Sequence, residues 1–279
     1  MIKIGLSAED QEQTIKFINR FKTHPGLLAW DIFDEAFTIP WGKDNYPLIR
    51  DRCAELKAID PYHPVFINEN QYGISYLHAK NLEFPGDIVS IDYYAWPPSG
   101  NLPITSRYTQ LMAAMGSKDG RPSWIYLLGA GYAFWASRDY TPAEHEFSAY
   151  ASVINGVSGI YYFASHPKSP SAWERIKGVL GELKELTPVI ASSARAPAVK
   201  CAAPEIEFLV KKYQGSVFII AVNSSRTPVD ARFHLPALNL RDRKTIAVLF
   251  EGRTLTVSNH AIADTFAGYQ RHIYKIEDR

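Results

Sequence analysis

Two different sequence periodicities meet near residue 191, and together they restrict what this chain can fold into. Up to about residue 190, strand-like and helix-like patterns alternate, whereas beyond it strand-like patterns follow one another. Alternating strands and helices are typical of a parallel sheet, and consecutive short strands are typical of an antiparallel one. The sequence therefore predicts an α/β barrel-like domain over residues 1–192 and a small antiparallel β-sandwich over residues 203–279.

Five short apolar runs in the first part have the length and composition of buried strands, and amphipathic segments separate them. In the second part, residues 229–235 alternate between apolar and polar side chains, which predicts a strand with one face in water. Glu251 and Gly252 separate two further apolar runs and predict a hairpin. The predicted strands of the first part cover residues 27–33, 64–68, 87–94, 122–128 and 159–163, and its predicted helices cover residues 7–21, 44–59, 105–115, 141–155 and 173–186.

The composition argues against several classes of partner. The chain carries 30 Lys and Arg against 29 Asp and Glu, with no long block of one charge, so neither a nucleic acid nor a membrane surface is expected as a partner. Cys53 and Cys201 lack metal-ligand spacing, and the sequence contains no phosphate-binding glycine loop or nucleophile-elbow serine, so no metal or cofactor is expected. No signal core follows Met1, and no apolar run has membrane-spanning length. As written, the sequence predicts a cytoplasmic protein, with a longer exported parent left open.

The first predicted strand ends in two carboxylates, Asp34 and Glu35. In α/β folds the chemistry lies at the carboxyl edge of the strands, so this position is a candidate active site. A carboxyl group packed against Trp30, Phe37 or Trp41 would have a raised pKa and would suit a general acid. The alternative interpretation is that Asp34 caps a turn and Glu35 is solvated.

Residues 24–30, continued through Asp34 and Glu35, resemble the fourth strand of the (β/α)8-barrel glycoside hydrolases that use two carboxylates, the β-galactosidase- and cellulase-like clan. In that family an Asn/Asp-Glu pair at this strand carries the acid/base glutamate. The resemblance implies a glycosidase acting on a β-linked sugar, with Glu35 as general acid/base and Asp34 positioning a sugar hydroxyl. Other segments are similar to the sixth, seventh and eighth strands and to the sandwich domain of several bacterial members: residues 86–94, 121–124, 155–163, 249–253, 264–266 and 269–274.

Only strands four to eight of the family barrel find a match, so the resemblance implies a partial barrel of about five βα units. An intact barrel needs about 200–250 residues, and about 190 are available before the sandwich. An open sheet of five strands would leave two edges and an apolar face uncovered. We therefore expect either a homo-oligomer that covers this face or a rearranged packing of the helices and the sandwich; a truncated gene is the other interpretation.

The family also places a nucleophilic glutamate at the end of its seventh strand, whereas residues 124–130 of this chain contain no acid. Asp92 and Glu69, which both stand at predicted strand ends, are the candidates for the second catalytic carboxylate. With strands about 4.8 Å apart, Asp92 would lie about 10 Å from Glu35 at the backbone. Inward-leaning side chains would bring the two within the roughly 6.5–9.5 Å of an inverting mechanism. Glu69, one strand away, would lie closer.

Aromatic side chains gather at or beyond the carboxyl ends of the predicted strands, where flat rings can cover the apolar faces of a sugar. Each ring alone is more simply explained by a core or an interface, and their concentration is what favours a carbohydrate site. Two hypotheses follow: an active glycosidase, or a non-catalytic carbohydrate-binding remnant that keeps the rings and lacks the second carboxylate. The residues expected to bind substrate, besides Asp34, are Trp41, Tyr72, Tyr94, Trp96, Tyr132, Trp135 and His166.

Overall fold

The computed structural model of the chain describes residues 8–97, 100–130, 137–163, 167–236, 238 and 244–277. The chain divides into two compact units. The first comprises Met1–Tyr93, Arg107–Leu127 and Gly156–Tyr161, and the second comprises Tyr94–Ser106, Leu128–Asn155 and Tyr162–Arg279. The predicted domain bounds, 1–192 and 203–279, stay a prediction.

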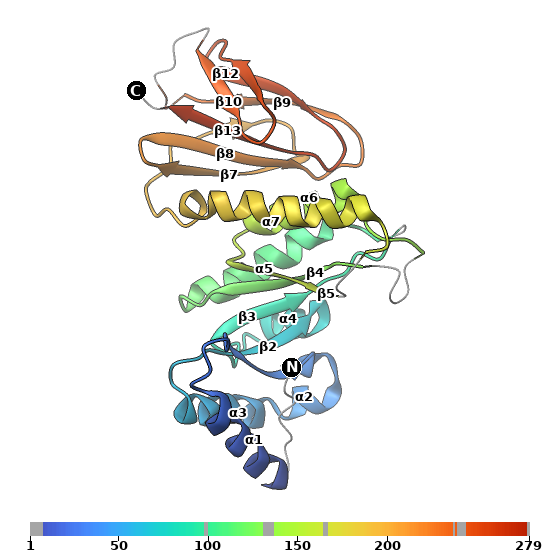
Figure 1. Cartoon of the computed structure of the whole chain (residues 1–279), viewed down its shortest axis with the longest axis vertical. Helices are drawn as coiled ribbons and strands as arrows, with labels where there is room; N and C mark the ends of the chain where they lie inside the picture. Colours follow the sequence, from blue (N-terminus) through green and yellow to red (C-terminus); the bar gives the residue numbers. More distant parts are fainter. Residues whose placement is uncertain are drawn as a thin grey trace. The chain divides into compact units, whose positions relative to one another are not determined.

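The first sheet is parallel, and its strands lie side by side in chain order, β1-β2-β3-β4-β5 (Figure 1). Helices follow the strands along the chain, as the connections of a parallel sheet require. The predicted fold class, a partial barrel of about five βα units followed by antiparallel sheets, is confirmed. The elements of this part are α1 Ala8–Phe21, β1 Trp30–Asp34, η1 Ala36–Thr38, α2 Pro40–Asp44, α3 Tyr46–Ile59, β2 Val65–Asn70, α4 Gln71–Ala79, β3 Ile88–Asp92, α5 Ile104–Lys118, β4 Ser123–Leu128, α6 Pro142–Ile154, β5 Gly159–Phe163 and α7 Pro170–Ile190.

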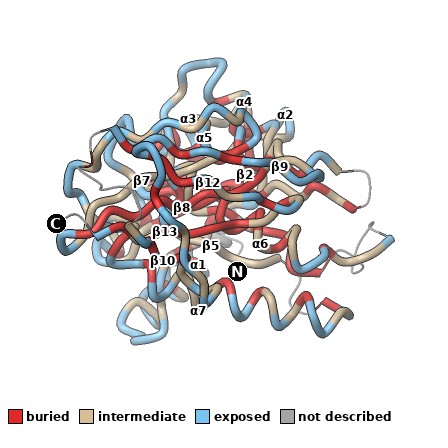
Figure 2. Tube along the Cα trace, turned by 90° about the horizontal axis from the view of Figure 1, so that it is seen from above, coloured by how far each residue is buried: buried red, intermediate tan, exposed pale blue. Residues whose placement is uncertain are grey.

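One face of the parallel sheet packs against helices, and β2 and β3 are buried along nearly their whole length. Figure 2 shows the burial of each described residue along the chain. On β1, the side chain of Trp30 is 2% exposed, and its ring lies 6.4 Å from that of Phe17 on α1. The Trp30 indole Nε1 donates a hydrogen bond of 2.8 Å to Asp60, just after α3. Trp30 therefore anchors the start of β1 to the helices, and it is not the residue that shields Glu35, which follows the other end of the strand.

The opposite face of the sheet carries aromatic rings from three strands, and we call it the ring face. Phe66 of β2 contacts Trp124 of β4 with ring centres 5.4 Å apart. Tyr161 of β5 lies 5.2 Å from Trp124 and stacks on Tyr126 at 5.1 Å. Trp124, Tyr126 and Tyr161 are only half-buried.

A register shift in β1 decides which of its side chains reach the ring face. Asp31 lies beside Phe66 of β2, and Asp34 lies beside Asn68, with the irregularity between Asp31 and Phe33. Phe66 and Asn68 are two residues apart on one strand, so they share a face. In a regular strand, residues three apart point to opposite faces. The shift therefore places Asp31 and Asp34 on the same face.

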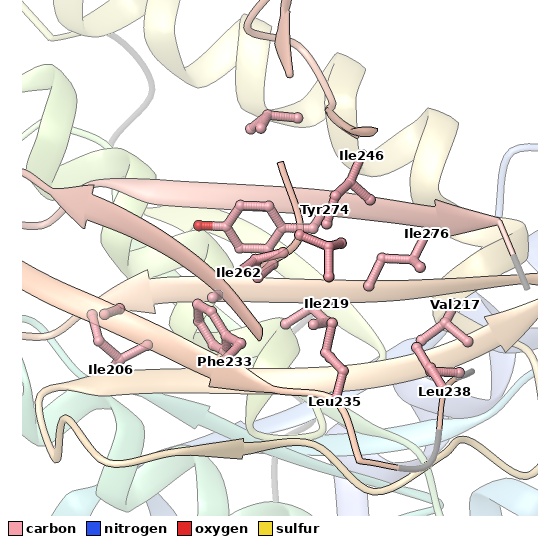
Figure 3. Packing of buried hydrophobic residues seen from close by; sticks show 14 of the residues in the cluster. Ile206, Val217, Ile219, Phe233, Leu235, Leu238, Ile246, Ile262, Tyr274 and Ile276 are labelled. Atoms are coloured by element: carbon pink, nitrogen blue, oxygen red, sulfur yellow. The ribbon is translucent and has the colours of Figure 1, made fainter. Parts of the chain in front are cut away.

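The C-terminal part folds into two antiparallel sheets, with strand orders β11-β10-β13-β8-β7 and β12-β9-β6. Buried aliphatic and aromatic side chains from both sheets form its core, and Phe233 and Tyr274 lie there with ring centres 5.5 Å apart (Figure 3). The predicted hairpin at Gly252 is confirmed, because β10 pairs antiparallel with β11 around it. The strands are β6 Lys200–Cys201, β7 Ile206–Tyr213, β8 Ser216–Asn223, β9 Val229–His234, β10 Thr245–Val248, β11 Arg253–Thr256, β12 Ala261–Phe266 and β13 Arg271–Glu277.

Within the second unit, α6 contacts β7, β8 and β13, and α7 contacts β7 (Figure 1). Arg271 of β13, 5% exposed, carries much of the polar part of this contact. Its guanidinium group bonds Glu182 of α7 at 2.8 Å and Glu251 at 2.9 Å, and it lies 5.7 Å from the ring centre of Tyr150 on α6. Because the buried cation has two carboxylate partners, its burial is compensated.

The structure contains elements that the sequence patterns do not predict, namely η1, α2, α4, β6, β8 and β12. The strand β8 is buried at every position and so lacks a two-residue alternation. The turn before it, Gln214-Gly215, has positive φ at both residues, as a two-residue hairpin turn requires. The prediction of one helix over 44–59 is wrong at its start, because α2 ends at Asp44 and α3 begins at Tyr46 with Pro47 in its first turn.

Candidate active site

The carboxyl ends of β1, β2 and β3 bring a row of polar side chains together on the ring face. Asn68 donates from Nδ2 to Asp34 Oδ1 at 3.2 Å, and it accepts at Oδ1 from the Ser90 hydroxyl at 3.1 Å. Asn68 and Ser90 are opposite each other in the β2–β3 register, so the row runs straight across three strands. Asp34 is exposed, whereas Asn68 and Ser90 are buried. One oxygen of Asp34 is thus held by an amide, and the residue is open to solvent.

Glu35 follows Asp34 in a strained backbone conformation. Its φ of 53° and ψ of 39° lie in the left-handed region, which costs a residue with a side chain about 1–2 kcal/mol. Its amide donates to the Asn68 carbonyl at 2.7 Å. Strained conformations of this kind persist only where the surroundings determine them, and they gather at functional sites.

The electrostatic surroundings of Glu35 favour its protonated form. Burial, and next the charge of Asp34, raise the pKa of Glu35 above its usual range, whereas a hydrogen bond with Asn70 lowers it in part. The side chain is half-buried, and Phe37, two residues on, is fully buried. A carboxyl group that is partly desolvated yet reachable has the properties of a general acid.

Glu69 lies at the carboxyl end of β2 and has no solvent exposure. Its Oε1 accepts a hydrogen bond of 2.9 Å from the Phe37 amide. Its Oε2 has no hydrogen-bond partner among the described residues and lies against Gly73 of α4, where an added Cβ would be 1.9 Å away. Burial raises the pKa of Glu69 to about 8, so the group is mainly protonated at neutral pH. A carboxylate that contacts a sugar is accessible and ionised, and Glu69 has neither property.

Asp92, at the end of β3, stands opposite Asn70 on one side and Tyr126 on the other. The pKa of Tyr126 is raised to about 12 by burial first, with the charges of Asp31, Asp34 and Asp92 adding to it. The Tyr126 ring thus lies among three carboxylates on the ring face. Asp92 is 8% exposed.

Asp31 belongs to this group, although no sequence motif singles it out. Both of its carboxyl oxygens are buried and lack a hydrogen-bond partner among the described residues. Burial raises the pKa of Asp31 to about 7, and the charge of Asp34 adds to the rise. Asp31 also lines a hollow of about 430 Å³, together with Leu28, Phe66 and other residues of β1, β4 and β5. One signal was available in the sequence: an acidic residue inside an otherwise apolar strand.

The described aromatic residues expected to bind substrate belong to both units. In the first unit, Trp41 is 40% exposed with its ring 6.3 Å from Phe33, and Tyr72 is 64% exposed in the first turn of α4. Tyr94 and Trp96 belong to the second unit, where their ring centres are 5.5 Å apart. Three expected residues lie outside the described part of the chain, namely Tyr132, Trp135 and His166.

The end of β4 carries no acid. Leu127, Leu128, Gly129 and Ala130 are all buried there. Within the described residues, no group of three or more His, Cys, Asp or Glu side chains is placed to hold a metal ion. No helix in the described part of the chain is long and apolar enough to cross a membrane.

No model of a protein family matches the chain, and no curated protein matches it significantly. Solved structures do. An α-amylase of Anoxybacillus matches with a TM-score of 0.55 at 9% identity, over 97% of this chain and 63% of that one. The α-amylase of Geobacillus thermoleovorans, complexed with acarbose, matches with a TM-score of 0.57 at 8% identity, over 97% and 64%. CelM2, a bifunctional glucanase-xylanase from a metagenome library, matches with a TM-score of 0.52 at 12% identity, over 98% and 70%.

The chain shares the fold of these solved structures. It spans less than two thirds of the length of the two amylases. Identities of this size show the fold alone. The β-galactosidase- and cellulase-like clan and the β-linked substrate therefore stay predictions.

Proposed function

We propose that the carboxylates at the ends of β1 and β3 hydrolyse a glycosidic bond, with Glu35 as the general acid. The observation that carries the proposal is the state of Glu35: left-handed backbone, half-buried carboxyl group and raised pKa, at the carboxyl edge of a parallel sheet. The fold shared with two amylases and a glucanase-xylanase supports it.

Asp92 is the second carboxylate in this proposal. It stands two strands from β1, which is about 10 Å at the backbone, and converging side chains fit the roughly 6.5–9.5 Å of inverting enzymes. Asp92 takes a proton from water, the water oxygen attacks the anomeric carbon, and Glu35 donates its proton to the departing glycosidic oxygen. Asp34, fixed at one oxygen by Asn68, accepts a hydrogen bond from a sugar hydroxyl at the other.

The proposal also specifies the configuration of the glycosidic linkage, α or β. The resemblance of residues 24–35 favours a β-linked sugar, whereas the matching structures include both amylases and a glucanase-xylanase. We propose β, with Trp41 and Tyr72 as exposed rings on the substrate side of the first unit. Matched α and β substrates decide between the two.

A second function, carbohydrate binding without catalysis, is favoured by one observation. The strand β4 ends in buried Leu127, Leu128, Gly129 and Ala130, so the position at which the resembled family has its nucleophile holds no carboxylate. A protein of this kind would keep the polar row and the rings and would bind a sugar unchanged.

Hydrolysis of paired α- and β-aryl glycosides by the wild type, Glu35→Gln, Asp92→Asn and Glu12→Gln tests the proposal. Glu12 is exposed on α1 and serves as the matched control. We expect turnover of a β-glycoside that falls by roughly 10²–10⁴-fold in Glu35→Gln, as loss of a general acid does. Asp92→Asn should lose turnover as well, and Glu12→Gln should keep it. A folded wild type that binds the sugars and cleaves none would support the binding function instead.

A further inference from the structure

Three consecutive residues at the end of β2 hold the segment that follows β1. The Glu35 amide donates to the Asn68 carbonyl at 2.7 Å, and the Phe37 amide donates to Glu69 Oε1 at 2.9 Å. The Thr38 hydroxyl donates to the Asn70 side chain at 2.7 Å. We call Asn68, Glu69 and Asn70 the β2 clamp. It binds residues 35–38 at three successive points.

Glu69 is the member of the β2 clamp that has no solvent exposure. Asn68 and Asn70 are two residues apart on β2, so they share a face, and Glu69 between them points the other way. There its carboxyl group meets η1 through Phe37 and meets α4 at Gly73. The missing side chain at Gly73 is what makes room for Oε2. α4 itself is held in place by Asn70, whose side chain accepts from the amides of Tyr72 and Gly73 at its first turn.

This geometry argues against Glu69 as a nucleophile or base. One of its oxygens is taken by the Phe37 amide, the other is enclosed at Gly73, and the residue has no exposed surface. A sugar carbon could reach Glu69 only if η1 or α4 moved away. The group is also mainly protonated at neutral pH, whereas a nucleophile or base must be ionised.

We propose that Glu69 is a positioning residue, whose buried carboxyl group fixes residues 35–38 and so keeps Glu35 in its left-handed conformation with its carboxyl group at the sheet edge. The left-handed conformation of Glu35 is unfavourable, and no side-chain cap at the start of η1 offsets it. The hydrogen bond between the Phe37 amide and Glu69, two residues after Glu35, is buried. Buried hydrogen bonds of this kind resist competition from water. The effect on catalysis rests on the proposed function of Glu35, whereas the positioning of residues 35–38 by Glu69 does not.

The test compares Glu69→Met, which keeps the side-chain volume and removes the acceptor, with Glu69→Gln, which keeps an acceptor oxygen. Hydrogen exchange of residues 35–38 is read first, with Glu12→Gln as the matched control. We expect exchange at Phe37 to accelerate about tenfold or more in Glu69→Met. In Glu69→Gln and in the control it should stay near the wild-type rate. Unchanged exchange in Glu69→Met would overturn the proposal.

Kinetics on the cleaved glycoside then separate positioning from direct chemistry. We expect Glu69→Met to lower kcat by roughly 10²-fold with KM little changed, since a misplaced acid affects the reacting state most. Glu69→Gln should keep most of the wild-type kcat. A Glu69→Gln protein with native exchange and as little turnover as Glu35→Gln would assign Glu69 to the chemistry and refute the positioning role. If the wild type shows no turnover, the proposed function fails, and the exchange data alone still decide whether Glu69 holds the segment.

Discussion

The negative charge of ionised Asp31 lowers the stability of the folded chain. Its folded-state pKa of about 7 lies above the ordinary value of 3.8, because burial and the nearby Asp34 disfavour the ionised form. Folding therefore favours the protonated acid. The stability that this preference contributes is fully present below about pH 4 and is lost as the pH rises toward about 7.

Asp31→Asn should remove this dependence, because the amide is neutral at every pH. We expect the variant to exceed the wild type in free energy of unfolding by about 1–2 kcal/mol near pH 8, a value reduced for solvent screening. The two proteins should be nearly equal near pH 4. Urea unfolding at both pH values measures the difference, with exposed Asp44→Asn as the control. A variant that is less stable than the wild type near pH 8 would show that ionised Asp31 has a stabilising partner.

At the scale of residues, the sequence predicts a position correctly where chain direction alone decides it. Asp34 and Glu35 follow an apolar strand, and they do lie at the carboxyl edge of the sheet. Glu69 follows the same logic, yet its side chain turns inward beneath η1. That direction depends on α4 and on the space at Gly73, which local patterns did not reveal.

The helix α6 shows how a local signal sets the start of an element. The Thr141 hydroxyl accepts from the Glu144 amide, the Glu144 carboxylate accepts from the Thr141 amide, and Pro142 occupies the first turn. This capping box satisfies two amides that the helix itself leaves unpaired. The predicted start of the helix at residue 141 is correct, since Pro142 in the first turn is a local signal.

Thr141→Ala should lower the free energy of unfolding by about 1 kcal/mol, the usual cost of losing a side-chain cap. Thr141→Ser keeps the hydroxyl and should retain most of the stability. Urea unfolding of the three proteins at one pH measures both values. Equal losses in the serine and alanine variants would mean that the threonine methyl group, and not the cap, supplies the stabilisation.

Two other elements escape local patterns, β8 because burial on both faces removes its alternation and α4 because it is short. The strand β8 is buried throughout, and α4 has only Gly73, Ile74 and Leu77 buried in nine residues. Neither shows the regular alternation that distinguishes strand from helix. Each is recognised from its boundary instead, the turn at Gln214-Gly215 for β8 and the Asn70 cap for α4.

At the scale of the whole molecule, β1 is an edge strand of its sheet within the described part of the chain. Among the described residues it pairs with β2 alone, and Leu28 just before it is 62% exposed. Leu28 lines the hollow on the ring face together with Tyr126 and Tyr161. Edge strands beside exposed apolar side chains tend to pair with another chain. We therefore expect a second copy of this chain to cover this edge.

Leu28→Lys should weaken that self-association, since a lysine on an edge opposes pairing. Light scattering at several concentrations compares the variant with the wild type and with Leu180→Lys, a matched control at an exposed position of α7. We expect an oligomer that becomes a monomer only in Leu28→Lys. A wild type that is monomeric throughout and melts cooperatively would contradict the expectation.

The sequence by itself determined five strands alternating with helical segments, followed by antiparallel strands, because alternation, caps and turns are local. It also determined that Asp34 and Glu35 end a strand. Only the tertiary structure decided which carboxyl groups share a face. The register shift in β1 brings Asp31 beside Asp34, and the packing of α4 encloses Glu69. Pairing register and burial arise from contacts between segments distant in sequence, and no local pattern encodes them.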